Sequence, residues 1–539
     1  MLANIITVTL EGLNTESVVV ETDITSGLPA LNIVGLPSAT VKESSERIRS
    51  AIINSGYNYS RNRITVNLSP ANMRKNGTHF DLPIALGVLL SSEEIKSEIT
   101  DSEIIKNTAF IGELSLDGKI VGIKGALPML LGVRNMGIKR IIVPMENYDE
   151  CKVISGLEII AVSKLKNAVF ALGRSVNELK AVNSSEILCY SKDGDDSEMM
   201  INMGGLNNVT GGKNSRSGDF ADIRGQEDAK RAMIIAAAGF HNVLMIGSPG
   251  AGKTMLASRL PGILPDMAFD EMLETTSIYS IAGELSERKP LILERPFRSP
   301  HHTSTVISLV GGGNKPMPGE ISLAHNGVLF LDEILEFPRY VLESLRQPIE
   351  MRRSIITRNN KRAEFPAKVL LVAAANPCKC GYYGDPNHEC NCTMSQVLSY
   401  RNKLSGPMID RIDLQLELPS LSSDAFFSDK NIGMSTADMK AQVEVAVTIQ
   451  KKRFKDMEIE KFNAHMNSDD IKLFCELEAE TESFAKDIFD SLKLSGRSYQ
   501  KLLRVARTIA DLEEKPRIER AHLAEAARYR LNAERNVYV

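Results

Sequence analysis

The sequence predicts a multidomain protein of mixed α/β and α+β class, and three observations support this fold class. The chain has 539 residues, too many to pack around a single hydrophobic core. Between about residues 217 and 420, short apolar runs alternate with helical stretches, as in a parallel sheet covered by helices. From residue 436 to the end, the apolar periodicity is helical. We therefore expect an α+β domain, an α/β domain and a helical domain, in that order.

The composition is that of an ordinary globular protein. Hydrophobic residues make up 43% of the chain and charged residues 24%, with a net charge of −4, so any contact with DNA must be local. The start, MLANIITVTLEG, has neither the basic nor the apolar region of a signal peptide. No 18-residue uncharged apolar stretch predicts a spanning helix. Seven cysteines, four of them in two C-x-C pairs, suit a reducing cytoplasm, where we expect the protein to act.

Residues 1–172 are expected to form a compact α+β domain. Short β-rich runs predict its strands, which are IITVTL, SVVVETDI, ITVNLSP, AFIGELSL and RIIVP. Helical periodicity runs from Val41 to Ile53, and Gly56 follows it as a stop signal. The stretch ALPMLLGVRNMG predicts a second, shorter helix.

Polar segments separate the three domains. Residues 173–216 are rich in Gly, Ser and Asn, which predicts a flexible linker. The α/β domain over residues 217–420 contains the buried strands VLMIG, GVLFLDE and VLLVAAANP. A second linker, SLSSDAFFSDKNIGMS, precedes the helical domain of residues 436–539.

A glycine-rich loop after VLMIG predicts a nucleotide site. It matches G-x-x-x-x-G-K-[ST] in full and lies between a predicted strand and a predicted helix. Backbone N–H groups of such a loop can surround a β-phosphate, the lysine reaches the β- and γ-phosphates, and the threonine can ligate Mg²⁺. The alternative is a Gly-rich turn that happens to precede Lys-Thr, and the strand–loop–helix context argues against it. The candidate nucleotide-binding residues are Gly247, Ser248, Pro249, Gly250, Ala251, Gly252, Lys253 and Thr254.

Two later strands end in polar residues that complete this site. Asp332 follows the strand in GVLFLDE and is placed to hold Mg²⁺, while Glu333 can deprotonate the attacking water. Asn376 ends VLLVAAANP, where its carboxamide can position that water. Strands often end in carboxylates, and an Asn before Pro377 can be a simple turn. The order of the three motifs nevertheless predicts an ATPase.

The same motifs carry a resemblance to a known family. The phrases PFRSPHHTSTVISLVGGGNKPMPGEISLAHNGVLFLDE, NPCKCGYYGD and LSGPMIDRIDL are similar to the YifB/ComM proteins, which are Mg-chelatase-like AAA+ ATPases. The resemblance covers essentially the whole chain, from ITVTLEGL to ARTIADL. It implies an AAA+ core with a carboxy-terminal helical lid, and a hexameric ring with ATP bound between subunits. For the ComM members it implies action on branched DNA during recombination in natural transformation.

The resemblance also implies roles for two arginines. Arg411 in IDRID matches the family's arginine finger, which reaches the γ-phosphate of a neighbouring subunit. The alternative for Arg411 is a salt bridge to Asp410 or Asp413. Arg497 in LSGRSYQKLL matches the sensor-2 arginine of the lid, with Arg504 as the second candidate. Both roles need a planar, permanently charged donor.

A basic stretch just before the Asn376 strand predicts a DNA contact. The sequence SIITRNNKRAEF reads as a hairpin, and in the related minichromosome-maintenance helicases the corresponding hairpin carries a basic pore residue. Counting back from Asn376, that position falls on Arg358, with Lys361 and Arg362 beside it. A ring of such charges could hold phosphates without reading sequence. The alternative is an ordinary solvated basic turn.

The histidine pair in RSPHHTS resembles a metal site, but its spacing argues against one. Adjacent residues such as His301 and His302 rarely point at one ion, and no Cys or acidic partner lies at ligand spacing. We interpret this stretch as part of the inserted helix-and-hairpin element typical of the clade, facing substrate.

The amino-terminal domain resembles the proteolytic domain of Lon, which has the ribosomal S5 domain 2-like fold. The resemblance rests on NLSPANMRKNGTHFDLPIAL and GELSLDGKIVGIKGALPMLLGVRNMGIKRIIVP. Lon needs a Ser nucleophile and a Lys that activates it. Here His79 occupies the Ser position and Leu127 the Lys position, so the implied domain is degenerate and inactive. Thr78 as a substitute nucleophile has no base within sequence reach.

Four cysteines after Asn376 predict a metal site. Cys378, Cys380, Cys390 and Cys392 form two C-x-C pairs nine residues apart, and four thiolates can close a tetrahedral Zn²⁺ site. His388 could replace one sulfur, and the alternative is four buried or free thiols. We expect zinc to fix a loop that could not pack by itself.

Three alternatives remain beside an oligomeric ATP-driven motor on branched or single-stranded DNA. The first is a Mg-chelatase-type ATPase that remodels a protein partner, although magnesium-chelatase motor subunits lack the Lon-like domain. The second is an ATP-dependent protease, which the lost Ser and Lys disfavour. The third is an ATP-gated scaffold without enzymatic activity, which the intact motifs disfavour. The sequence leaves the preferred DNA structure, the ring size and the polarity of translocation open.

Overall fold

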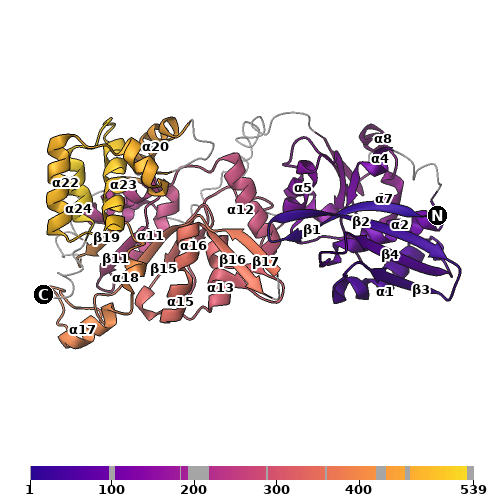
Figure 1. Ribbon diagram of the computed structural model, residues 1–539, viewed down its shortest axis with the longest axis horizontal. Coiled ribbons are helices and arrows are strands. Elements are labelled where there is room, and N and C mark those ends of the chain that lie inside the picture. The colour runs from indigo at the N-terminus through magenta and orange to yellow at the C-terminus, as the bar shows by residue number, and fades with distance from the viewer. Residues whose placement is uncertain are drawn as a thin grey trace. The chain divides into compact units, whose positions relative to one another are not determined.

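The computed structural model places most of the chain in two units (Figure 1). It describes residues 2–95, 103–182, 184–191, 218–286, 289–358, 361–420, 433–455 and 462–530. The amino-terminal unit joins residues 1–212 with residues 269–292 and 357–364. The second unit comprises residues 213–268, 293–356 and 365–539. We call it the P-loop unit because it contains the glycine-rich loop of residues 247–254, which we call the P-loop. Two segments inside the expected α/β domain, 269–292 and 357–364, thus group with the amino-terminal residues.

A mixed sheet organises the described residues of the amino-terminal unit. Its eight strands run in the order β10-β9-β8-β5-β1-β2-β4-β3. The central β1, β5, β8 and β9 are parallel, whereas β2 pairs antiparallel with both β1 and β4. The strands are β1 (Ala3–Glu11), β2 (Asn14–Thr25), β3 (Ala30–Val34), β4 (Arg63–Ser69), β5 (Thr108–Phe110), β8 (Arg140–Pro144), β9 (Glu158–Val162) and β10 (Ile187–Tyr190).

Helices cover this sheet, and both predicted helices are among them. The helix expected from Val41 to Ile53 is α1, and Gly56 just beyond it has a φ of 83°, as a stop signal requires. The helices are α1 (Ala39–Asn54), α2 (Asp81–Ser91), α4 (Glu103–Lys106), α5 (Ala126–Asn135), α6 (Tyr148–Cys151), α7 (Leu165–Ala171), α8 (Val176–Ala181) and α12 (Phe269–Ala282). Of these, α12 follows the P-loop in sequence but packs on α5.

Two details of this unit differ from the prediction. The run AFIGELSL is not one strand, because it breaks after Phe110 and resumes as β6 (Glu113–Leu114), which pairs with β7 (Ile120–Val121). At Gly112, in the break, a Cβ would lie 2.9 Å from Cγ2 of Ile120, so the close approach needs glycine. The expected linker also begins later, since its first residues form α8 and β10. A capping box at Ser175 starts α8, and β10 pairs with β9. Residues 192–217 lie outside the described residues.

The P-loop unit is built on a five-stranded parallel sheet, which confirms the predicted parallel α/β arrangement. Its described strands run in the order β12-β15-β18-β11-β19, so β11, which precedes the P-loop, lies between β18 and β19. These strands are β11 (Val243–Gly247), β12 (Phe297–Arg298), β15 (Val328–Leu331), β18 (Leu370–Ala375) and β19 (Leu414–Leu418). Smaller ladders join β13 (Gly311–Gly312) with β14 (Met317–Pro318), and β16 (Arg353–Arg358) with β17 (Lys361–Pro366).

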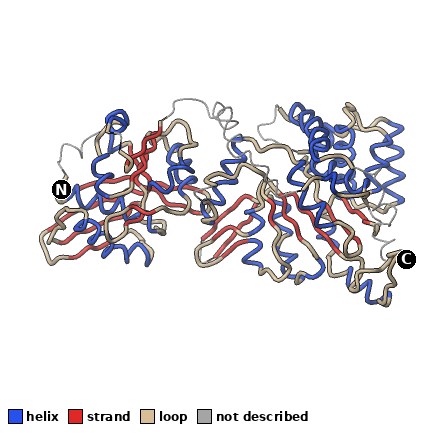
Figure 2. The backbone as a smooth tube through the Cα atoms, turned by 180° about the vertical axis from the view of Figure 1, so that it is seen from behind, coloured by secondary structure: helices blue, strands red, loops and turns tan. Residues whose placement is uncertain are grey.

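Side chains that alternate along these strands enter two separate cores. Phe330 of β15 and Val372 of β18 belong to the core shared with the carboxy-terminal helices, whereas their neighbours Leu329 and Leu371 belong to the core on the opposite face. Both faces are covered by helices, as the back view shows (Figure 2). Burial on both faces explains why the sequence of each strand is continuously apolar.

Thirteen helices accompany the described part of this unit. The carboxy-terminal α20, α22, α23 and α24 lie together (Figure 1), and α20 and α23 both pack on α10. Those before the second expected linker are α10 (Glu227–Gly239), α11 (Lys253–Arg259), α13 (Val306–Val310), α14 (Glu320–Leu323), α15 (Arg339–Ser344), α16 (Arg346–Met351), α17 (Met394–Arg401) and α18 (Gly406–Ile409). Those after it are α20 (Thr436–Arg453), α21 (Ser468–Phe474), α22 (Ala479–Ser491), α23 (Gly496–Leu512) and α24 (Arg520–Arg528).

Among the helices of the described residues, none has both the length and the apolar character needed to cross a bilayer.

Candidate nucleotide site and cysteine cluster

The predicted P-loop connects β11 to α11. Gly250 and Gly252 have φ angles of 81° and 89°, in the left-handed region that favours glycine. A Cβ at either position would meet nothing within 4 Å, so backbone conformation rather than lack of space requires glycine here. The loop therefore has the open form that lets backbone N–H groups face a phosphate.

Lys253, the first residue of α11, folds back over this loop. Its Nζ donates to the carbonyl oxygens of Gly247 at 2.5 Å and Ser248 at 3.0 Å, and to Oδ1 of Asn376 at 3.1 Å. Burial lowers the pKa of Lys253, while the negative charges of Asp332 and Glu333 act in the opposite direction. The ammonium group thus lies among acceptors that phosphate oxygens can replace.

The structure brings the three predicted motifs to one edge of the sheet. β15, β18 and β11 are parallel neighbours, so the residues that follow them emerge side by side. The Thr254 hydroxyl donates to Oδ2 of Asp332 at 3.0 Å. This pair of oxygens fits the preference of Mg²⁺ for hydroxyl and carboxylate ligands.

Glu333 follows Asp332 in a left-handed conformation, with a φ of 49°. Its backbone N–H donates to Oδ1 of Asp332 at 3.0 Å, which links the two residues. Non-glycine residues with this conformation are uncommon and occur often at functional sites. The carboxylate itself is half exposed and free to meet a water molecule.

His302 was not expected at this site. Its Nδ1 lies 3.7 Å from Oε2 of Glu333, and its ring packs against His301 and the edge of Phe337. Two helices, a small hairpin and a strand separate His302 from Glu333 in the sequence, so no local pattern could predict the contact. The histidine stretch therefore lies beside the candidate catalytic carboxylate.

Gln226 is a second residue that the sequence did not indicate. It precedes α10 in a left-handed conformation and donates through Nε2 to the carbonyl oxygens of Pro419 at 2.8 Å and Ala251 at 3.4 Å. Ala251 belongs to the P-loop, so this side chain fixes the loop to the end of β19.

The two arginines implied by the resemblance meet at one carboxylate. Arg411 and Arg497 both pair with Glu350 of α16, Arg497 at 2.9 Å. Among the described residues, Arg411 pairs with neither of the alternative partners, Asp410 and Asp413; its other hydrogen bonds go to the carbonyl oxygens of Arg346 and Pro407. Arg497 lies at the start of α23, as predicted, and 54% of its side chain is exposed.

Arg504, the second candidate for the sensor role, is largely buried. Burial lowers its pKa, and its Nε has no hydrogen-bond partner among the described residues. Its surroundings include the ion pair between Asp413 and Lys501, whose atoms lie 2.9 Å apart. This position suits helix packing better than contact with a nucleotide, and it favours Arg497.

The basic hairpin forms as predicted, from β16 and β17. The turn residues and the side chains of Arg358 and Lys361 lie outside the described residues. Arg362 is 68% exposed, and its guanidinium lies 3.9 Å from Glu364. The backbone of Glu364 lies against the β1–β2 turn, where a Cβ on Gly12 would be 2.8 Å from its oxygen.

The four cysteines converge on one point. Their sulfur atoms all lie within 4.8 Å of one another, with Cys378 3.2 Å from Cys380 and 3.7 Å from Cys390. Zn–S bonds of about 2.3 Å in a tetrahedron require sulfur separations of about 3.8 Å. The seven cysteines are all free, so no disulfide competes for these thiols. The donor set fits zinc, and His388 is not part of it, since that ring stacks on Tyr382.

The Lon-like positions carry no catalytic dyad. Nε2 of His79 lies 2.9 Å from the carbonyl oxygen of Val8, and Leu127 is fully buried in the core around α5. The ammonium group of Lys75 is likewise occupied, because it donates to the carbonyl oxygens of Pro70 and Met73. Neither replacement supplies the Ser hydroxyl or the Lys of the Lon dyad.

Thr78 differs from expectation in one respect. Its hydroxyl donates to the Glu113 carboxylate, which the fold brings near although it lies 35 residues away. A carboxylate can act as a general base, so the fold brings Thr78 a base that the sequence did not predict. The Lys of the Lon dyad is still absent, because Leu127 occupies its position.

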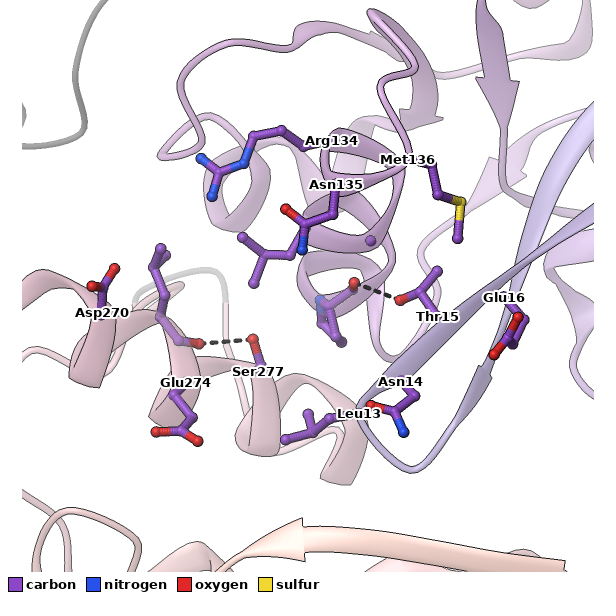
Figure 3. A pocket seen from close by; sticks show the side chains of 14 residues that line it. Leu13, Asn14, Thr15, Glu16, Arg134, Asn135, Met136, Asp270, Glu274 and Ser277 are labelled. Carbon is purple, nitrogen blue, oxygen red and sulfur yellow. Dashed lines mark hydrogen bonds between the residues drawn. The ribbon is translucent and has the colours of Figure 1, made fainter. Parts of the chain in front are cut away.

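A cavity of about 610 Å³ opens in the amino-terminal unit between α5, α12 and the β1–β2 turn (Figure 3). At its floor the Thr15 hydroxyl donates to the Pro128 carbonyl oxygen at 2.9 Å. The wall carries one guanidinium, that of Arg134, and three carboxylates, those of Glu16, Asp270 and Glu274. Acidic side chains thus outnumber basic ones in the lining, which disfavours a phosphate backbone there.

Comparison with known proteins matches most of the chain to one family. The model described as magnesium chelatase, subunit ChlI, matches residues 219–426. Two further models match residues 20–147, described as subunit ChlI of Mg-chelatase, and residues 433–530, described as the carboxy-terminal part of magnesium chelatase subunit ChlI.

Individual relatives cover nearly the full length. The chain is 41% identical to YifB of Escherichia coli over 519 residues, 96% of this chain and 95% of that protein. It is 40% identical to the competence protein ComM of Haemophilus influenzae over 520 residues, with the same coverage. A shorter match, 27% identical over 159 residues, joins 27% of this chain to 19% of the Lon protease of Lachnoclostridium phytofermentans. The chain therefore belongs to the YifB/ComM family of Mg-chelatase-like proteins.

Proposed function

We propose that the protein is an ATP-hydrolysing AAA+ motor. The observation that carries this proposal is the convergence of Lys253, Asp332, Glu333 and Asn376 on one sheet edge. Family membership supports the same activity. In this proposal the parallel sheet and its helices are the AAA+ core, α20–α24 form the helical lid, and the amino-terminal unit is a degenerate Lon-like domain.

Each residue of the site has a separate role in the proposed hydrolysis. Lys253 exchanges its backbone and Asn376 acceptors for the β- and γ-phosphate oxygens. Thr254 and Asp332 would hold Mg²⁺, which neutralises phosphate charge when bound. Glu333 accepts the proton of the attacking water, and Asn376 orients that water.

The two paired arginines support an oligomer. Arg411 and Arg497 share Glu350, so both can be presented together to one nucleotide. We assign Arg411 as the finger and Arg497 as the sensor, acting at the boundary between subunits of a hexameric ring. Each would stabilise charge on the γ-phosphate in the transition state.

The substrate we propose is branched or single-stranded DNA, with the motor driving branch migration during recombination. The relative named competence protein supports a role in natural transformation. The hairpin of Arg358, Lys361 and Arg362 is the proposed contact, because basic side chains bind phosphates without reading sequence. The family models named for magnesium chelatase favour, as a second candidate, a motor that remodels a protein partner.

We also propose that Cys378, Cys380, Cys390 and Cys392 bind one structural Zn²⁺. The convergence of the four sulfur atoms supports this assignment. Free thiolates and ATP as substrate both suit the cytoplasm, where we place the protein.

ATP turnover with and without a four-way DNA junction tests the proposal, with Glu333→Gln as the blank. We expect junctions to stimulate turnover and Arg358→Ala to remove the stimulation while basal turnover persists. Turnover that no DNA changes would refute the DNA motor and favour a protein-remodelling ATPase. Absence of turnover in the wild-type chain would refute the ATPase itself.

A further inference from the structure

The loop that carries the four cysteines touches the P-loop. A Cβ added to Gly381 would lie 2.9 Å from both Cγ and Cδ of Pro249, so the backbone at Gly381 lies close to the proline ring. Gly381 directly follows Cys380 and has a φ of 92°. The cysteine loop therefore contacts Pro249, the third residue of the phosphate-binding motif.

A second contact lies four residues further along the same loop. The Asp385 side chain is 1% exposed and accepts from the backbone N–H of Asn387 at 2.8 Å. A hydrogen bond from Ser248 is the largest of the interactions that lower the pKa of Asp385 to about 2. Two consecutive P-loop residues, Ser248 and Pro249, are therefore in contact with the cysteine loop.

The cysteine loop has little of its own to hold it in this place. Within the described stretch 377–393 it forms no helix or strand, and residues 386–389 are exposed. Its backbone turns rest on two hydrogen bonds, from Gly381 to Cys378 and from Asp385 to Tyr382. Arg401 holds part of the loop from outside, through the carbonyl oxygen of Pro377 and the ring of Tyr383, and the four sulfur atoms add a cross-link when metal is bound.

We propose that zinc bound by the four cysteines sets the affinity of the P-loop for ATP. A bound metal would fix the loop whose Gly381 and Asp385 contact Pro249 and Ser248. The first ligand, Cys378, lies two residues after Asn376, which accepts from Lys253, so the chain also connects metal and nucleotide site directly. This inference rests on the proposed zinc site and on the proposed ATP binding.

Two glycines of the loop give a matched pair of variants. Gly381→Ala places a methyl group 2.9 Å from Pro249, whereas Gly384→Ala, also at positive φ, places one where no atom lies within 4 Å. Both substitutions strain the backbone, but only the first presses on the P-loop. Each would be made in the full chain with Glu333→Gln, so that binding of a fluorescent ATP analogue is measured without hydrolysis.

The measurements are zinc per chain, by elemental analysis, and the Kd for the analogue. We expect one zinc per chain in the parent and both glycine variants, with Kd raised about tenfold by Gly381→Ala and unchanged by Gly384→Ala. Removing zinc from the parent with a chelator should raise Kd similarly, and adding zinc back should restore it.

The outcomes separate the proposals. A parent without zinc refutes the zinc site. A parent with zinc whose Kd is indifferent to its removal and to Gly381→Ala refutes the coupling but leaves the zinc site intact. Equal loss in both glycine variants attributes the effect to backbone strain and also refutes the coupling. A parent that binds no ATP analogue refutes the proposed nucleotide site.

Discussion

Replacing Glu333 with glutamine tests the chemistry of the candidate site most directly. The substitution keeps the shape of the side chain but removes its ability to accept a proton. The backbone hydrogen bond from residue 333 to Asp332 and the bond between Thr254 and Asp332 are both untouched. We therefore expect a defect in hydrolysis without a defect in nucleotide binding.

The size of the defect follows from the role assigned to the carboxylate. General bases contribute about 10²- to 10⁴-fold to a rate, or about 2.7–5.5 kcal/mol of activation free energy. ATP affinity should be unchanged or tighter, because the substitution removes a negative charge from beside the phosphates. The imidazole of His302, 3.7 Å from Oε2 of Glu333, lies beside the substituted position but makes no hydrogen bond that the substitution would remove.

Steady-state ATP turnover and equilibrium binding of an ATP analogue measure the two effects. Glu336→Gln is the matched control, since it removes the same charge three residues further on, where the carboxylate faces Lys403 at 3.6 Å. We expect the control to stay within about threefold of the wild-type rate, as surface ion pairs contribute little. A Glu333→Gln rate within fivefold of wild type would show that Glu333 is not the base.

Three further predictions concern the subunit boundary and the amino-terminal unit. Arg411→Ala should lower kcat by about 10³- to 10⁵-fold. Mixing it with Glu333→Gln subunits should recover part of the turnover, because one variant keeps Glu333 and the other keeps Arg411. Mixtures as inactive as their components would contradict a finger that acts between subunits. Burial raises the pKa of Asp81 to about 6, although the hydrogen bonds from Arg47 act in the opposite direction. The folded state therefore keeps a proton that the unfolded state loses, and the free energy of unfolding should fall as pH rises from about 4 to about 6. In thermal unfolding, Asp81→Asn should lack that fall, and a pH profile parallel to that of the wild type would contradict the assignment. Casein should remain intact on incubation with the protein and ATP, since His79 and Leu127 replace the Lon dyad, and ATP-dependent cleavage seen by gel electrophoresis would revive the protease.

Local patterns account for what the sequence could predict. The apolar runs before Asp332 and Asn376 predicted strands, and parallel pairing alone is enough to bring residues at their ends together. The P-loop was predictable for the same reason, because its glycines, lysine and threonine are consecutive. The spacing of the cysteines likewise predicted a cluster that the structure forms.

Contacts between distant segments could not be predicted in this way. Neither the approach of His302 to Glu333 nor the hydrogen bonds of Gln226 to the P-loop leave a mark in composition or periodicity. The polar composition after residue 173 also hid α8 and β10, because β10 is a run of only four apolar residues, Ile187–Tyr190, next to a long polar stretch. β10 becomes a strand because it pairs with β9 in the folded protein.

Glu350 shows how such a distant contact can matter for function. Arg411 follows α18 and Arg497 begins α23, yet one carboxylate of α16 holds both guanidinium groups. Two permanently charged groups repel each other unless an anion lies between them, and Glu350 supplies that anion within the single chain. A γ-phosphate carries more charge and more acceptor oxygens than one carboxylate, so in the proposed oligomer it would take over both arginines from Glu350. We therefore propose that Glu350, which hydrolysis itself does not use, keeps the two arginines together until a nucleotide binds.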